Sequence, residues 1–437
     1  MRHNEVVQKL QSNFSTTKNL KESGIPWLGK IPEHWEISRF KYFYCSNMGE
    51  TILAQDLEDE GIPIYSATEE ERYFGRIKNP KIKLKEGDFV IPARGTIGAV
   101  KLVKELSTCT QTTIYSKQQK YSVPSYVYYF LIGFREHLFR FIQTAIPQIT
   151  VSQVNDNPLL YPPIEEQKAI ADFLDKKTHQ IEEFITKKQK LITLLEEKKQ
   201  TLINQCVTQG LDSSISLKDS GVEWLGKIPT HWGVKKLKLL FGIGSGLGIT
   251  KADFVSSGIP CVSYGEIHSK YPCRLDTKIH SLPYVSEDYL ESKPQALLKK
   301  GDFVFADTSE DIEGSGNFTS VQSDEPVFAG YHTIVLKPKT QRIHSPYFSF
   351  LFDSLAMRNQ VRKEVCGVKV YSITKSILRE IQCLIPPLEE QKAIAEYLDT
   401  QIAKIDLAIS KIKSQINLIK EYKSTLISEA VCGRIGI

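Results

Sequence analysis

PPIEEQKAIADFLD at residues 162–175 returns as PPLEEQKAIAEYLD at residues 386–399, with eleven identical positions. A second segment, KESGIPWLGKIPEHWEISRFK at residues 21–41, returns as KDSGVEWLGKIPTHWGVKKLK at residues 218–238, with twelve identical positions. Self-similarity at this spacing indicates an internal duplication. The sequence therefore predicts two halves, and each half is a variable block followed by a common block.

The common blocks have a helical pattern. Apolar residues recur at alternating steps of four and three residues, from Ile170 to Leu202 and again from Ile394 to Leu426. A seven-residue repeat of this kind is typical of a coiled-coil seam. We expect two long helices that pack antiparallel on each other, the first over about residues 165–208.

The residues that flank these repeats fit helix ends. A proline pair precedes each helix, acidic residues follow in its positive first turn, and a glycine stands beyond its last turn. These residues are Pro162, Pro163, Glu165, Glu166 and Gly210 in the first half, and Pro386, Pro387, Glu389, Glu390 and Gly433 in the second.

The variable blocks read as mixed strand and helix. The predicted strands are residues 87–91 and 112–115 in the first block, and 301–305 and 333–336 in the second. The predicted aromatic-rich helices are residues 125–142 and 345–361.

Composition excludes several classes of protein. Hydrophobic residues form 41% and charged residues 24% of the 437 residues, which is too apolar for a disordered chain. The longest apolar run, Tyr126 to Phe134, is too short to cross a bilayer, and the first twenty residues hold no apolar block of a signal peptide. Eight cysteines without a C-x-x-C pair predict reduced thiols and a cytoplasmic location. The net charge of +5 permits a nucleic-acid partner without requiring one.

We find no catalytic constellation. The glycine-rich run at residues 241–248 lacks the Lys-Ser/Thr of a phosphate loop and the G-x-G-x-x-G spacing of a dinucleotide loop, so we expect a structural turn. Asp156 with Glu166 and Lys168 faintly resembles the Asp…Glu-x-Lys pattern of metal-dependent nucleases, but the Glu and Lys fall in a helix start. The repeated His-Trp pairs at residues 34–35 and 231–232 are expected to be packing units. We predict no catalytic residues, no metal and no cofactor.

The repeated W-L-G-K-I-P-x-H-W, the G-D-F-V strand and the P-P-[IL]-E-E-Q-K-A-I-A helix start together resemble the specificity (S) subunit of Type I restriction-modification enzymes. The resemblance spans about residues 21–437 and implies an α+β chain with two target-recognition domains and two long antiparallel helices in an internal pseudo-twofold repeat. The implied domains are residues 1–160 and 211–385, and the implied spacer helices are residues 161–210 and 386–437.

The resemblance also implies a non-catalytic role. Each domain would read one half of a bipartite site in double-stranded DNA, and the helices would fix the gap. Methylation of adenine N6 and ATP-dependent cleavage would belong to two methyltransferase (M) subunits and to restriction (R) subunits. No membrane partner is expected.

Polar residues in the loops after the G-D-F-V strands and before the common blocks are the candidates for DNA contact, since Arg and Gln can each grip a base edge with two hydrogen bonds. The predicted DNA-binding residues are Arg94, Thr96, Gln111 and Gln148 in the first block, and Thr308, Ser309, His332 and Lys369 in the second.

M-subunit docking is expected on the shared helix start and on apolar residues that widen the seam. The predicted docking residues are Glu166, Gln167, Ile185, Ile192, Glu390, Gln391, Ile409 and Ile416. Two alternatives remain at this stage. A coiled-coil scaffold would bind no DNA, and a self-contained nuclease or methyltransferase would show turnover that depends on Glu166 and Glu390.

Overall fold

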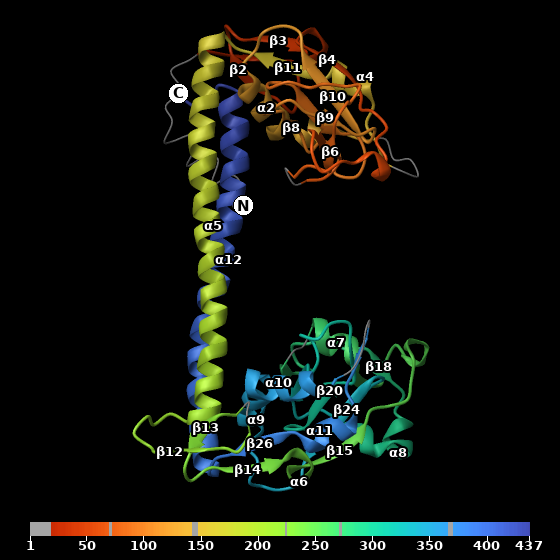
Figure 1. Cartoon of the computed structure of the whole chain (residues 1–437), viewed down its shortest axis with the longest axis vertical. Coiled ribbons are helices and arrows are strands. Elements are labelled where there is room, and N and C mark those ends of the chain that lie inside the picture. Colours follow the sequence, from red (N-terminus) through yellow and green to blue (C-terminus); the bar gives the residue numbers. More distant parts are fainter. Residues whose placement is uncertain (1–18, 70–71, 142–146, 223–224, 271–272, 366–369) are drawn as a thin grey trace. The chain divides into compact units, whose positions relative to one another are not determined.

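The computed structural model describes residues 19–69, 72–141, 147–222, 225–270, 273–365 and 370–437. The chain divides into two compact units. The first unit comprises Met1–Gln189 and Ile412–Ile437, and the second comprises Lys190–Lys411. Each unit therefore holds one variable block together with one end of each long helix (Figure 1).

The two common blocks form long helices, as predicted. Helix α5 spans Ile164–Gln209 and helix α12 spans Leu388–Val431. The glycines beyond them, Gly210 and Gly433, have φ angles of 76° and 67°, a left-handed conformation that glycine adopts without a steric penalty and that ends a helix.

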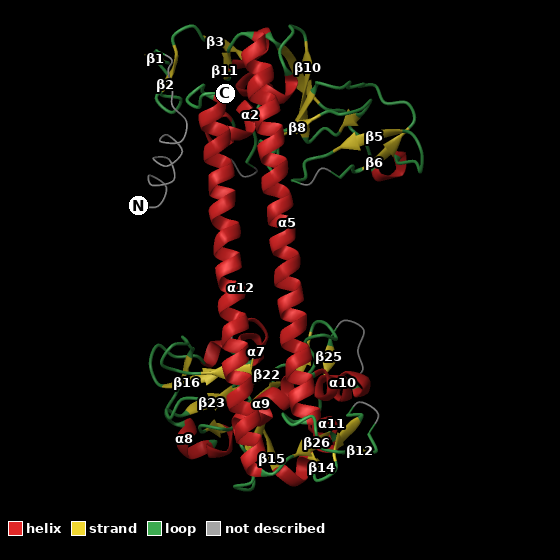
Figure 2. Cartoon of the chain, turned by 90° about the vertical axis from the view of Figure 1, so that its left-hand side faces the viewer, coloured by secondary structure: helices red, strands yellow, loops and turns green. Residues whose placement is uncertain are grey.

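Within each unit the helix ends lie side by side and antiparallel (Figure 2). In the first unit, Leu174 near the start of α5 shares a hydrophobic core with Leu426 near the end of α12. Lys423 Nζ also donates to Glu182 Oε1 at 2.7 Å. In the second unit, Val207 shares a core with Leu398, and Lys199 Nζ lies 2.8 Å from Asp406 Oδ1.

The buried stripe of α5 departs from the strict seven-residue seam. Phe184 and Leu191, both on the predicted seam, are 40% and 41% exposed, whereas Ile185 packs against the core of the first unit. An α-helix with 3.6 residues per turn drifts relative to a 3.5-residue repeat, so the buried positions shift by one residue along the helix.

The first block is built on an antiparallel sheet in the order β4-β10-β7-β8. Its strands are β4 (Tyr44–Met48), β10 (Thr113–Gln118), β7 (Phe89–Pro92) and β8 (Lys101–Leu102). A smaller sheet holds β6 (Gly75–Ile77), β5 (Ile62–Tyr65) and β9 (Thr108–Cys109), and two-stranded pairs join β1 (Leu20–Glu22) to β2 (Lys30–Pro32) and β3 (Glu36–Arg39) to β11 (Pro158–Tyr161). The predicted strands at 87–91 and 112–115 are β7 and β10.

The helices of the first block are α2 (Pro124–Gly133), α3 (Arg135–Leu138) and α4 (Val151–Asp156), with short 3-10 turns at Phe40–Tyr42 and Ala54–Asp56. The single helix predicted at 125–142 is divided, because Phe134 lies outside the helical region with φ −119° and ψ 23°. It also ends earlier than predicted, at Leu138, and residue 142 lies outside the described residues.

The second block has a five-stranded sheet in the order β15-β24-β20-β22-β17. Its strands are β15 (Phe241–Ser245), β24 (Thr333–Pro338), β20 (Phe303–Ala306), β22 (Phe318–Val321) and β17 (Cys273–Leu275). A second sheet contains β18 (Tyr284–Val285), β16 (Ile259–Val262), β23 (Val327–Ala329) and β19 (Leu297–Leu298). The paired short strands are β12 (Leu217–Asp219) with β13 (Lys227–Pro229), β14 (Gly233–Lys236) with β26 (Gln382–Ile385), and β21 (Thr308–Ser309) with β25 (Tyr371–Ser372).

The helices of the second block are α6 (Leu237–Leu240), α7 (Tyr264–Ser269), α8 (Tyr289–Ser292), α9 (Ser345–Asp353), α10 (Leu355–Glu364) and α11 (Lys375–Glu380), with 3-10 turns at Lys251–Asp253 and Pro294–Ala296. The predicted helix at 345–361 is divided at Ser354, whose extended backbone and hydroxyl cap the start of α10. The expectation of a turn for the glycine-rich run is wrong, because residues 241–245 form strand β15 and residues 246–248 follow it as an irregular segment. A Cβ at Gly246 would lie 2.1 Å from the carbonyl oxygen of Gly330, so close backbone approach explains that glycine.

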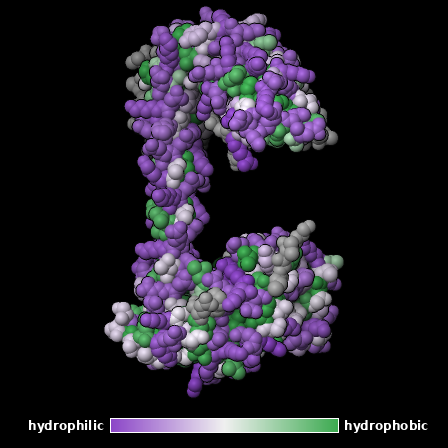
Figure 3. Space-filling view, viewed as in Figure 1, coloured by the Kyte–Doolittle hydropathy of each residue, from purple (hydrophilic) through white to green (hydrophobic). Residues whose placement is uncertain are grey.

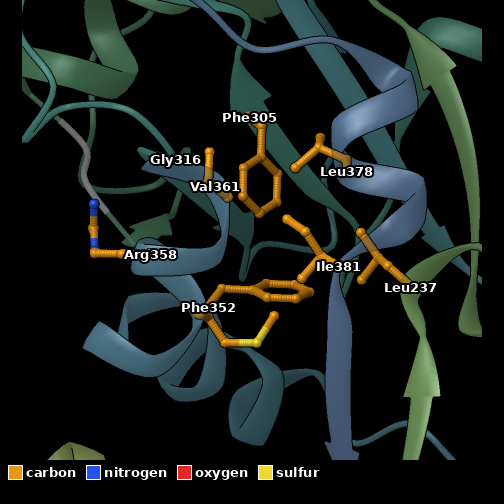
Figure 4. A pocket seen from close by; sticks show the side chains of 9 residues that line it. Leu237, Phe305, Gly316, Phe352, Arg358, Val361, Leu378 and Ile381 are labelled. Atoms are coloured by element: carbon orange, nitrogen blue, oxygen red, sulfur yellow. The ribbon is translucent and has the colours of Figure 1, made fainter. Parts of the chain in front are cut away.

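The core of the second block is filled by its own side chains. Phe305, Phe352 and Ile381 converge on a cavity of only about 10 Å³ (Figure 4). Arg358 lies at the edge of this group, with its guanidinium directed away from the rings. This space is packed core and holds no ligand-sized opening.

A buried tyrosine joins each block to the end of a long helix. The Tyr126 hydroxyl donates to the carbonyl oxygen of Val431 at 3.2 Å in the first unit. The Tyr347 hydroxyl donates to that of Val207 at 3.3 Å in the second. Both bonds satisfy a carbonyl that the helix end leaves without an intrahelical partner.

Candidate nucleic-acid interface

Two segments that are distant in sequence meet at the end of β7 in the first block. The amide of Ile149 donates to the carbonyl oxygen of Ala93 at 3.0 Å. Beside this bond, Arg94 Nε donates to Gln148 Oε1 at 3.0 Å. The structure thus brings together two of the residues predicted to bind DNA, and it places Arg94 at the surface.

The loop that carries Arg94 is fixed on several sides. Thr96 Oγ1 donates to the carbonyl oxygen of Ala67 at 3.1 Å. Arg135 Nε and Nη2 donate to the carbonyl oxygen of Ile97 at 2.9 and 2.8 Å. Gly98 has φ 69°, and a Cβ there would lie 2.6 Å from the Phe139 ring. The loop has little room to change its conformation.

Gln111 lies on the turn that precedes β10. Its neighbour Thr112 accepts a hydrogen bond from the amide of Ala93 at 3.0 Å, so this turn lies against the start of the Arg94 loop. Gln111 itself is exposed, and its Oε1 accepts a long hydrogen bond of 3.4 Å from the amide of Ile52.

The same two segments meet in the second block. The amide of Ile373 donates to the carbonyl oxygen of Asp307 at 2.7 Å, and the strand pairing sets Thr308 opposite Ser372. The amide of Asp307 in turn donates to the carbonyl oxygen of His332 at 3.1 Å. His332 has a left-handed backbone with φ 53°, and its Nδ1 lies 3.1 Å from Asp307 Oδ1.

Thr308, Ser309 and His332, all predicted to bind DNA, line one cleft with a volume of about 780 Å³. Lys369, the fourth residue predicted in this block, lies outside the described residues. Three of the described lining residues, Glu310, Asp311 and Glu313, are acidic, and none is Lys or Arg. The other lining residues are Tyr264, Gly265, His268, Gly314, Asn317 and Val370.

A polar chain that the sequence did not reveal supports this cleft. Arg358 Nη1 donates to Asn317 Oδ1 at 2.8 Å, and Asn317 Nδ2 lies 2.9 Å from His268 Nδ1. Because the arginine can only donate, it fixes the orientation of the amide, which then donates to the imidazole. His268 Nε2 in turn donates to the carbonyl oxygen of Thr308 at 2.7 Å. Arg358 is itself held by Asp353 Oδ1, 2.9 Å from Nη2.

The shared glutamates bind the repeated His-Trp segments. Glu166 accepts from Trp35 Nε1 at 3.1 Å, and His34 Nε2 lies 2.6 Å from the other carboxylate oxygen. In the second unit, Glu390 accepts from Trp232 Nε1 at 2.9 Å, with His231 Nε2 at 2.7 Å. The two arrangements fasten each block to a helix start.

The other predicted docking residues differ in exposure. Gln167 and Gln391 are buried, and each accepts a 2.9 Å hydrogen bond from a backbone amide of its block. Ile409 and Ile416 are 8% and 7% exposed. Ile185 and Ile192 are half-buried. Docking at these positions stays a prediction.

The residues of the faint nuclease pattern serve other contacts. Asp156 pairs with Lys41 and Arg39, whose hydrogen bonds and positive charges lower the pKa of its carboxyl group. Lys168 pairs with Glu165, 3.0 Å away. Within the described parts of the chain, no group of three His, Cys, Asp or Glu side chains is placed to hold a metal ion.

The family model for the Type I restriction modification DNA specificity domain matches residues 32–194 and again residues 229–418. The chain belongs to this family. The two matches fall on the two halves of the duplication, so the family's DNA specificity domain is present twice.

Known members of the family resemble the chain, one over most of its length and another over a shorter segment. The Type I restriction enzyme MjaVIII specificity subunit of Methanocaldococcus jannaschii is 25% identical over 423 residues, which cover 93% of this chain and 94% of the relative. The EcoKI specificity subunit of Escherichia coli is 30% identical over 101 residues, 23% of this chain and 22% of the relative.

Solved structures support the fold. A chain from a study of complex assembly and conformational transition of the type I R-M system has a TM-score of 0.69 at 14% identity, covering 92% of this chain and 98% of its own. The HsdS subunit of Thermoanaerobacter tengcongensis has a TM-score of 0.51 at 16% identity, covering 93% and 98%. Among the residues that the structure describes, no helix has the length and apolar character needed to cross a membrane.

Proposed function

We propose that each variable block reads one half of a bipartite DNA site, through the surface where the loop after β7 or β20 meets the segment before α4 or α11. The observation that carries this proposal is the repeated junction, in which Ile149 bonds to Ala93 and Ile373 bonds to Asp307. The backbone arrangement is shared, while the side chains around it differ. Two domains that recognise different DNA sequences on one scaffold need a shared backbone arrangement and different side chains.

The predicted division into recognition domains (residues 1–160 and 211–385) and spacer segments (161–210 and 386–437) belongs to the same proposal. The Glu166 and Glu390 contacts support it, because they fasten each block to a helix start and so restrict how far it can turn. A fixed connection lets two readers set the spacing of two half-sites.

We further propose that the helices dock two M subunits, which methylate adenine N6, and that R subunits join them for ATP-dependent cleavage in a cytoplasmic complex. Several apolar side chains of the helices are exposed and available for a partner. They are Phe184 and Leu418 in the first unit, and Leu191, Leu194, Tyr397 and Leu407 in the second. Figure 3 shows hydrophobic residues scattered among hydrophilic ones on the visible face of the helices. Partly hydrophobic helix faces of this kind commonly bind other helices.

The experiment is to express the chain with an M subunit encoded beside it, in a host free of other DNA methylation, and to map modified adenine in the DNA. We expect one motif with two specified halves around a fixed unspecified gap. Replacing residues 217–384 by the corresponding block of another family member should change one half and leave the other. If the complex assembles but modifies no defined motif, or if the swap changes both halves, the proposal is wrong.

A further inference from the structure

We infer that Arg94 is a base-reading residue of the first block and that it recognises a guanine in the major groove, with Gln148 as its positioning residue. This inference rests on the proposed function and adds the chemistry of one base position. It assigns the first half-site a guanine within reach of the loop after β7.

The geometry of the pair leaves one edge of the Arg94 guanidinium available for binding. Its Nε is engaged by Gln148 Oε1 at 3.0 Å, and Arg94 is exposed. In the part of the chain that the structure describes, Nη1 and Nη2 make no hydrogen bond. These two parallel donors match two adjacent acceptors. Guanine presents O6 and N7 together on its major-groove edge, whereas adenine presents a donor beside N7.

The support beneath Arg94 is rigid before any ligand binds. Arg135 fixes the Ile97 carbonyl, and Thr96 fixes the opposite side of the loop through Ala67. Gln148 is half-buried and follows directly on the backbone junction made by Ile149. A side chain held in its binding geometry loses little conformational entropy on binding, which favours selective recognition.

The comparison of the two blocks favours a base over a phosphate as the target. Both half-sites have the same sugar-phosphate backbone and differ only in their bases. Arg94 and Gln148 of the first junction stand where Thr308 and Ser372 face each other in the second. The side-chain pair differs between the two blocks while the surrounding protein backbone is alike. Such a pair is expected to contact the bases, which differ between the two half-sites.

The test uses the complex of the full chain with its M subunit and compares Arg94→Lys and Gln148→Ala with the unchanged chain. Lys keeps the charge but lacks the planar fork. For each protein variant, short DNA duplexes are prepared in which the bases of the first half-site are replaced one at a time. The methylation rates of these duplexes give the discrimination between bases at each position. We expect Arg94→Lys to lose roughly 5- to 150-fold discrimination for guanine at one position. Gln148→Ala should lose part of that discrimination at the same position.

The control variant is Arg39→Lys, which changes an exposed arginine on β3 that pairs with Asp156. It should leave every base preference unchanged. An unchanged second half-site in all variants shows that the complex has folded and assembled. If Arg94→Lys keeps full discrimination at every position, Arg94 reads no base and the inference is wrong. It is equally wrong if the first half-site lacks guanine. Failure of the proposed function is a different result, because the unchanged chain would then define no bipartite motif.

Discussion

The loop after β7 and the loop after β20 occupy corresponding places in their blocks, but they differ in charge and in support. The first carries Arg94 and is fixed by Arg135. The second carries Glu310 and Asp311, and the chain from Arg358 through Asn317 holds it. Arg135 donates directly to the first loop, whereas Arg358 acts on the second through Asn317 and His268. The difference shows that the backbone junction is the common element and that the side chains on it are free to vary.

The largest effect is expected from Gly98→Val in the first loop. The left-handed backbone of Gly98 costs a non-glycine residue about 1–2 kcal/mol. The added side chain would also collide with the Phe139 ring, since a Cβ alone would lie 2.6 Å from it, and overpacking costs about 1–3 kcal/mol. The free energy of unfolding of the first unit should fall by about 2–5 kcal/mol. Denaturant titration of the purified chain measures it.

Gly248→Ala is the matched control for this change, because a Cβ at Gly248 would meet nothing within 4 Å. Methylation mapping should show the first half-site weakened by Gly98→Val and the second unaffected. An equal loss at both half-sites would show that the two loops do not act separately.

Arg358→Ala should give the corresponding effect in the second block. It removes the donors to Asn317 and Asp353, and it leaves a largely buried carboxylate without its cation. Losing hydrogen bonds to a charged group costs about 1.5–3 kcal/mol. We expect thermal unfolding of the second unit at a lower temperature, together with weaker selection of the second half-site alone.

Arg379→Ala, an exposed arginine on α11, is the control and should change neither quantity. If Arg358→Ala lowers stability but leaves the second half-site as selective as before, the polar chain supports the fold and not the reading surface.

The sequence predicted the common framework well because that framework rests on local signals. The proline pairs, the glycines beyond Gln209 and Val431, and the apolar repeats determine α5 and α12 without reference to the rest of the chain. The G-D-F-V strands were also recognisable, since the duplication aligns them. The pairing of Arg94 with Gln148 is non-local. The sequence nevertheless predicts both as DNA-binding residues, because Arg94 follows the G-D-F-V strand and Gln148 precedes the common block.

The polar chain that supports the second cleft could not be predicted from the sequence. His268, Asn317 and Arg358 come from α7, from the turn before β22 and from α10, and no spacing rule links these three elements. Similarly, the sequence predicts Glu166 as a helix-start and docking residue. Its bonds to His34 and Trp35 depend on how the block folds back on the helix.

Neutralising the acidic side of the second cleft should have a smaller effect. Glu310→Gln with Glu313→Gln removes two negative charges from a surface that we propose faces the DNA, where phosphates repel them. Affinity for non-cognate DNA should rise by roughly two- to tenfold at low salt, and the gain should shrink as salt screens the charges. Fluorescence anisotropy of the assembled complex at two salt concentrations measures this affinity.

The control is the double variant Glu287→Gln with Glu291→Gln, at a residue beside α8 and a residue on it. An equal gain from this control pair would assign the effect to net charge alone.

The smallest effect concerns the carboxylates that end α4 and α11. Lys236 and Lys238 lie 2.5 and 2.6 Å from the Glu380 carboxylate, and their hydrogen bonds lower its pKa from 4.5 to about 2. A lowered pKa means that the ion pairs stabilise the fold fully above about pH 4.5 and lose this effect as the pH falls through about 2. Glu380→Gln should therefore be slightly less stable than the unchanged chain at pH 6, and the difference should narrow at pH 3. The stability of Asp156→Asn should follow the same pH dependence, because Lys41 and Arg39 lower the pKa of Asp156.

Denaturant midpoints at pH 6 and pH 3 measure the stability of both variants, with Glu364→Gln as the control. If neither variant differs from the unchanged chain at pH 6, these pairs do not stabilise the junctions, because screening of the exposed charges by water cancels their attraction.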